Sequence, residues 1–84
     1  MRFSEHHEKY RGEIPAQESI SLNLCERAVS EAVESRRQAD GRIQFWGYVE
    51  EEDRYLKVVL EPDTREIITA HFDRGFKSKM RRQR

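Results

Sequence analysis

The fold is constrained most strongly by three runs of alternating apolar and polar residues, 42–49, 54–61 and 66–72. Because successive side chains of a strand point to opposite faces, each run predicts a strand with one buried face. The buried face is expected to carry Ile43, Phe45, Gly47, Val49, Leu56, Val58, Leu60, Ile68, Ala70 and Phe72. The acidic connection 50–53 is short, and the turn 62–65 begins with a proline that presets φ. Such connections join antiparallel neighbours, so the runs predict an antiparallel meander.

An apolar stripe with helical spacing precedes these strands. It consists of Leu22, Cys25, Val29, Ala32 and Val33. Spacings of three and four residues place these side chains on one side of a helix. This helix is expected to begin at Ser19 or Ser21 and to end near Arg37, before Asp40-Gly41 breaks the chain. Residues 1–4, ahead of it, can form a short edge strand.

Length limits the chain to one domain, because 84 residues leave no room for a second core. Charged residues make up 38% and apolar residues 36%, so the core is thin. The single cysteine, Cys25, excludes an intrachain disulfide and is expected to be a small buried residue. The expected fold class is α+β. N-terminal helical segments (1–37) pack on one face of a three- to four-stranded antiparallel meander (42–72), followed by a basic C-terminal tail or short helix (73–84).

A neutral total charge hides a strong polarity. Six of the 16 basic residues lie in residues 74–84, which contain no acidic residue, so residues 1–73 carry a formal charge of −6. The six are Arg74, Lys77, Lys79, Arg81, Arg82 and Arg84. Such a cluster is typical of a surface that binds a polyanion, and RNA is the first candidate. The alternative is a solubilising terminus.

One face of the meander is expected to stay partly open, because the helix covers only the other. Alternation places on it Gln44, Trp46, Tyr48, Tyr55, Lys57, Ile67, Thr69 and His71. Aromatic, hydroxyl and imidazole groups on an uncovered sheet face suit stacking on unpaired bases and contact with phosphate. The alternative is a second small core, in which Trp46, Tyr48 and Tyr55 pack against the N-terminal segment or the C-terminal tail.

A series of short segments over nearly the whole chain carries a resemblance. The segments are Phe3-Ser4-Glu5-His6, Ile20-Ser21, Val29, Val33, Tyr55-Leu56-Lys57-Val58-Val59, Ile67-Ile68-Thr69-Ala70-His71-Phe72 and the basic end. Their order resembles the RelE- and BrnT-like proteins, toxin components of bacterial toxin–antitoxin systems with a helix-then-meander fold. The resemblance implies a metal-independent endoribonuclease that needs no cofactor, acts on mRNA and is held inactive by an antitoxin protein.

The expected chemistry requires a base for the 2′-hydroxyl, cations at the transition state and an acid for the leaving 5′-oxygen. Histidine suits both proton transfers because its pKa lies near neutrality. Either His6 or His7 is therefore expected to pair with His71. The other expected roles are phosphate contact by Arg54, Arg74 and Lys77, orientation by Tyr55 and Thr69, base stacking by Trp46 or Tyr48, and further RNA contact by Lys57, Lys79, Arg81 and Arg82.

Two readings without catalysis stay open. One is an RNA-binding module in which the basic tail supplies the affinity, and the other is a protein-interaction domain that offers its sheet edge or open face. No metal is expected, because adjacent histidines on a helix diverge and no H-E-x-x-H or cysteine pair is present. No apolar run reaches the roughly 20 residues that span a bilayer, so we expect a cytoplasmic protein without a membrane partner. The sequence does not indicate an oligomeric state.

Overall fold

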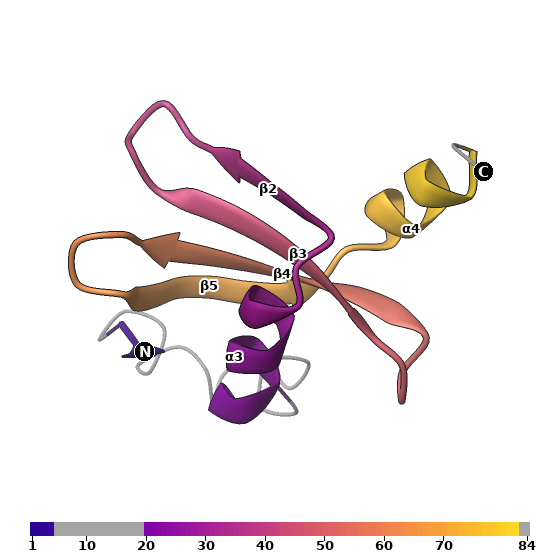
Figure 1. Cartoon of the computed structure of the whole chain (residues 1–84), viewed down its shortest axis with the longest axis horizontal. Helices are drawn as coiled ribbons and strands as arrows, with labels where there is room; N and C mark the ends of the chain where they lie inside the picture. Colours follow the sequence, from indigo (N-terminus) through magenta and orange to yellow (C-terminus); the bar gives the residue numbers. More distant parts are fainter. Residues whose placement is uncertain (5–19, 83–84) are drawn as a thin grey trace.

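The computed structural model describes residues 1–4 and 20–82, and the predicted catalytic candidates His6 and His7 lie outside these ranges. The described residues form five strands and two helices (Figure 1). In chain order they are β1 (Arg2–Phe3), α3 (Leu22–Ser30), β2 (Glu34–Arg37), β3 (Ile43–Val49), β4 (Arg54–Glu61), β5 (Glu66–Phe72) and α4 (Arg74–Arg82).

The strands form one mixed sheet in the order β1-β5-β4-β3-β2. Strands β2 to β5 are antiparallel to their neighbours, whereas β1 runs parallel to β5. The expected fold, N-terminal helices on an antiparallel meander of three or four strands, is therefore wrong. Two edge strands enlarge the sheet, the parallel β1 makes it mixed, and a helix follows it. The strand β1 is the short edge strand expected within residues 1–4, whereas β2 was not expected, because three of its four residues are charged.

The helix α3 ends at Ser30, seven residues before the expected end near Arg37. The backbone N–H of Val33 instead donates to the carbonyl of Trp46 at 2.8 Å, which brings the chain alongside β3. A hairpin then joins β2 to β3, and Gly41 adopts the left-handed backbone that its turn requires (φ 93°). Asp40-Gly41 is thus a hairpin turn rather than only a break after a helix.

The helix α3 begins at Ser21, whose hydroxyl accepts a hydrogen bond of 3.1 Å from the backbone N–H of Leu24. It buries Cys25 and Ala28 against the sheet. The approach is close at β3, because a Cβ added to Gly47 would lie 2.4 Å from the carbonyl oxygen of Ala28. A glycine is therefore required where the helix backbone crosses this strand.

A shift in the β4–β5 pairing between Val59 and Leu60 changes the face of the sheet on which Ile67 lies. Leu60 pairs with Ile67, whereas Val59 pairs with Thr69, so Ile68 is an extra residue in β5. Such a bulge interrupts the alternation of side chains. Ile67 consequently lies in the core with no exposed surface, although alternation had placed it on the opposite face and Ile68 in the core.

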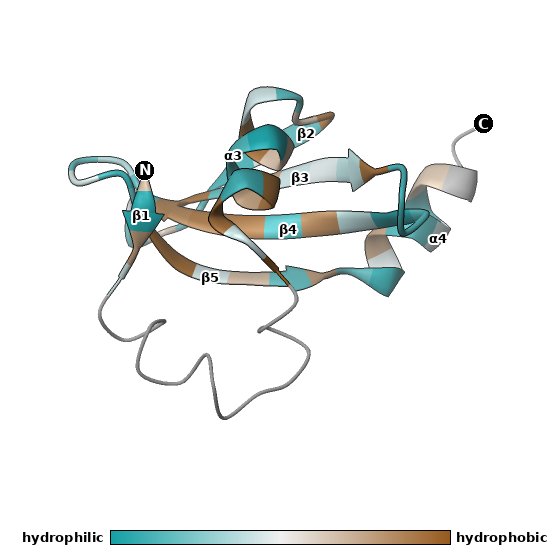
Figure 2. Ribbon diagram, turned by 90° about the horizontal axis from the view of Figure 1, so that it is seen from below, coloured by the Kyte–Doolittle hydropathy of each residue, from teal (hydrophilic) through white to brown (hydrophobic). Residues whose placement is uncertain are grey.

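Two apolar clusters lie on opposite faces of the sheet. The larger one joins α3 to the sheet and includes Cys25, Leu56 and Val58. The smaller one joins Trp46 and Tyr55 to Phe76 of α4, with Met80 packed against it. Figure 2 shows α3 lying over the sheet and α4 at its far end. The C-terminal segment therefore covers part of the face that was expected to be open.

Across the described ranges, the helices are too short and too polar for any of them to cross a membrane.

Candidate functional site

Two aromatic residues of the face that was expected to be open, Trp46 and Tyr55, pack against Phe76 of α4. The Trp46 ring stacks on Phe76 at a centroid distance of 5.2 Å and an interplanar angle of 12°, and Tyr55 meets Phe76 edge-on at 4.9 Å. Only 5% of Trp46 and 9% of Tyr55 is exposed. These contacts form the second small core, so the Trp46 ring is covered while α4 is docked.

Asp73 connects this aromatic cluster to the start of α4. One of its carboxylate oxygens accepts the indole N–H of Trp46 at 3.0 Å, and the other accepts the backbone N–H of Phe76 at 3.0 Å. Burial raises the pKa of Asp73, but these hydrogen bonds, together with the charge of Lys57, outweigh it and hold the pKa below its ordinary value. Asp73 is therefore an ionised cap for a helix that begins with Arg74.

A second polar contact holds α4 to the β3–β4 hairpin. Lys77 Nζ donates to the side-chain carboxylate of Asp53 at 2.8 Å and to the backbone carbonyl oxygen of the same residue at 2.9 Å. The same carboxylate accepts the Tyr48 hydroxyl at 2.6 Å, and this bond raises the pKa of Tyr48. Tyr48 is 41% exposed, so its ring is the accessible member of the aromatic group.

The three cations expected around a phosphate come together in one pocket at the base of α4. This cationic pocket has a volume of about 300 Å³ and is lined by Arg54, Asp73, Arg74, Lys77 and Ser78. The Arg54 guanidinium lies 3.9 Å from the centre of the Phe72 ring and contacts Glu52 at 2.9 Å. Sequence reasoning missed Ser78. Its spacing of four residues from Arg74 indicates it if the segment forms the short helix, which was one of the two expectations for residues 73–84.

Four other basic residues were expected to contact RNA. Lys57 and Lys79 lie outside this pocket. Lys79 Nζ is 3.8 Å from Glu34 on β2, and Lys57 Nζ lies 5.5 Å above the Trp46 ring. The side chains of Arg81 and Arg82 are not among those that the structure describes. The expected basic surface is therefore divided between the pocket and the sheet face.

His71 lies on that sheet face, exposed and directly opposite Lys57 on β4. Burial of part of its ring lowers the pKa of His71, and the charge of Lys57 lowers it further, whereas Asp73 opposes the shift. The imidazole is therefore mostly neutral at pH 7 and can accept a proton. Thr69 shares the face and pairs with Val59. Because His6 and His7 are outside the described residues, pairing of either one with His71 stays a prediction.

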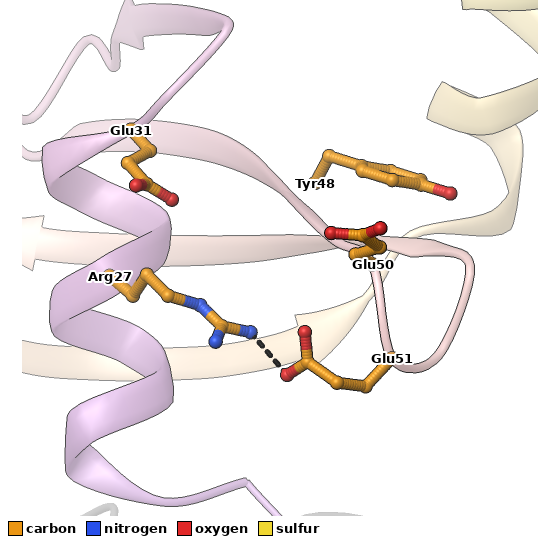
Figure 3. A pocket seen from close by; sticks show the side chains of 5 residues that line it. All are labelled: Arg27, Glu31, Tyr48, Glu50 and Glu51. Carbon is orange, nitrogen blue, oxygen red and sulfur yellow. Dashed lines mark hydrogen bonds and ion pairs between the residues drawn. The ribbon is translucent and has the colours of Figure 1, made fainter.

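An acidic pocket of about 420 Å³ lies between α3 and the β3–β4 hairpin (Figure 3). It is lined by Arg27, Glu31, Tyr48, Glu50 and Glu51. Arg27 forms a 2.6 Å ion pair with Glu51, which raises the pKa of Arg27 and lowers that of Glu51. The remaining carboxylates repel a polyanion, so this pocket disfavours such a ligand. Sequence reasoning treated this acidic segment only as a connection.

In the part of the chain that the structure describes, no group of three or more histidine, cysteine, aspartate or glutamate residues is arranged to hold a metal ion. Comparison with known proteins adds no relative: no family model, no curated protein and no solved structure matches the chain. The RelE- and BrnT-like resemblance therefore rests on its short segments and stays a prediction.

Proposed function

We propose that this protein binds single-stranded RNA through the cationic pocket at the base of α4. The observation that carries the proposal is the convergence of Arg54, Arg74 and Lys77, which come from two distant parts of the chain, on one pocket. Guanidinium groups bind phosphate oxygens through paired hydrogen bonds, and the Ser78 hydroxyl adds a neutral donor. A phosphate of the RNA backbone is the ligand that best matches this set of groups.

The acidic partners of these cations do not prevent phosphate binding. The carboxylates of the Arg54–Glu52 and Lys77–Asp53 pairs are 46% and 66% exposed. Exposed ion pairs contribute only about 0–1 kcal/mol each. A phosphate can therefore replace these contacts at little cost, and Arg74, which also lines the pocket, is exposed.

The proposed preference for single-stranded RNA rests on the groups beside the cationic pocket. The exposed Tyr48 ring is bonded to the same aspartate as Lys77, so it offers a stacking surface beside the pocket. On the sheet face, Lys57, Thr69 and His71 supply donors for phosphate and the 2′-hydroxyl. Unpaired nucleotides can reach both kinds of group.

The test measures binding of a labelled single-stranded RNA by fluorescence anisotropy at several salt concentrations. We expect Arg74→Ala to weaken binding by roughly three- to tenfold and to reduce the salt slope by about 0.7. The matched control is Arg65→Asn, which removes the same charge at the β4–β5 turn, at the other end of these strands, and accommodates the positive φ of 57°. Equal binding by Arg74→Ala and wild type, or no binding at low salt, refutes the proposal.

The lowered pKa of His71 favours a second candidate, metal-independent cleavage of RNA with this imidazole as the base. Lys57 lies directly across the strand pair, where its charge can stabilise a developing phosphorane. We expect cleavage in the presence of a chelator and its loss in His71→Ala. Cleavage that is equal in the two proteins, or absent from both, contradicts this candidate. If an antitoxin partner exists, the product of an adjacent reading frame should relieve growth arrest caused by the protein.

A further inference from the structure

The strand β2 forms one edge of the sheet. Within residues 1–4 and 20–82, no strand pairs with the side of β2 that faces away from β3. Ser35, Arg36 and Arg37 are exposed there, and Val33, just before the strand, is 53% exposed. An edge of this kind can accept another strand unless its side chains oppose pairing.

The hairpin indicates which backbone groups of β2 point outward. The N–H of Gln38 donates to the carbonyl of Arg42 at 2.7 Å, so these two residues form a hydrogen-bonded pair. Bonded and non-bonded pairs alternate along an antiparallel ladder. Arg36 therefore bonds across to Gln44, whereas the N–H and C=O groups of Ser35 and Arg37 face away from β3.

The charges on this edge discriminate between pairing registers. In an antiparallel pair of identical strands, the central residue lies opposite its own copy. A pair centred on Glu34 or on Arg36 places like charges opposite each other, which is destabilising. A pair centred on Ser35 instead places Glu34 of each copy opposite Arg36 of the other, so the 3.4 Å ion pair that these residues form within each chain is exchanged for one of two across the joint. The outward N–H and C=O groups of Ser35 then meet those of its copy.

From this complementarity we propose that two copies of the chain associate through β2, antiparallel and centred on Ser35. Val33 then faces Arg37 of the other copy, whose aliphatic stem covers the exposed valine. The N–H of Val33 already donates to Trp46, so the backbone bonds of the joint are those of the Ser35 pair. The two sheets become one continuous sheet with equivalent faces on the same side. Because Lys79 of α4 contacts Glu34 of β2, both α4 helices lie near the joint on one face.

The first test measures the mass of the purified full chain in solution by light scattering and sedimentation equilibrium, without RNA. We expect a concentration-dependent dimer. Ser35→Pro should weaken association by at least about tenfold, because it removes an outward N–H while leaving the bonds to β3 intact. The matched control, Ser35→Ala, keeps the N–H and should associate as the wild type does. A monomeric wild type, or a folded Ser35→Pro protein that still dimerises, overturns the proposal.

Charge reversal decides the question if Ser35→Pro does not fold. Glu34→Arg and Arg36→Glu should each weaken association, because each places like charges across the joint, and the double variant should restore it. Failure of the double variant to recover association overturns the proposed register. In addition, Ser35→Cys treated with oxidised glutathione, which accepts the two electrons, should form an intermolecular disulfide, whereas the wild type, whose Cys25 is buried, should not. Each readout is independent of RNA, so failure here is distinct from failure of RNA binding.

Discussion

The indole N–H of Trp46 donates a hydrogen bond of 3.0 Å to the carboxylate of Asp73, 27 residues further along the chain. The same carboxylate accepts the backbone N–H of Phe76 and so caps α4. Strand β3 and helix α4 therefore share one acceptor. Because Trp46 is the single tryptophan, its fluorescence reports directly on whether this helix is docked.

Replacement of Asp73 by alanine should lower the free energy of unfolding by about 1–2 kcal/mol. The change removes the helix cap and leaves the indole N–H without its acceptor. Urea denaturation followed by Trp46 fluorescence measures the effect. Asp73→Asn, which keeps an acceptor oxygen and a good capping side chain, is the control and should lose less. Equal stabilities of Asp73→Ala and wild type would contradict this coupling.

Phe76→Ala should release α4 from the sheet, since Phe76 contacts both Trp46 and Tyr55. Removing a buried aromatic ring costs about 3 kcal/mol, which exceeds what the remaining exposed polar contacts contribute. We expect the Trp46 emission to shift to longer wavelength while the far-UV signal of the strands persists. Ser78→Ala, on the exposed side of the same helix, should leave the emission unchanged. An unshifted spectrum in Phe76→Ala would show that other contacts hold the helix.

Gly47→Ala should destabilise the fold by about 2–3 kcal/mol, because the added methyl group would meet the backbone of Ala28 rather than a flexible side chain. Thermal unfolding measures the loss. Gly75→Ala is the matched control, since its Cβ would lie 3.4 Å from a carboxylate oxygen of Asp73, an ordinary van der Waals distance. Within α4 that substitution should stabilise the helix by up to about 1 kcal/mol. Similar effects of the two substitutions would disprove the close crossing of α3 over β3.

Stability should decrease as the pH falls below about 6.5, in a manner that depends on His71. Burial and the charge of Lys57 lower the pKa of His71 in the folded chain, so the unfolded chain binds this proton more readily. The associated stability is fully present above the ordinary pKa of 6.5 and is lost as the pH falls through the lowered folded value. The fall in melting temperature should be smaller in His71→Gln than in the wild type. An NMR titration that places the pKa of His71 above 6.5 would contradict the argument.

Alternation and turn residues predicted β3, β4 and β5 at nearly their observed positions. The apolar stripe predicted α3, but not its end at Ser30, because Val33 bonds to Trp46 on a strand that is distant in sequence. The bulge that brings Ile67 into the core was likewise not predictable. A bulge changes how the residues of a strand pair, not which residues the strand contains, and it reverses the faces of the residues beyond it.

For the site, the sequence alone determined the kinds of group present. It identified the cations of the C-terminal segment, the aromatic residues and His71, because charge and alternation are local properties of the chain. Only the tertiary structure decided which of these groups are accessible and which lie together. Docking of α4 buries Trp46 and Tyr55, and it brings Arg74 and Lys77 beside Arg54. The physical reason is that Phe76 and Met80 bury their apolar surface only against a sheet face that is assembled from distant strands.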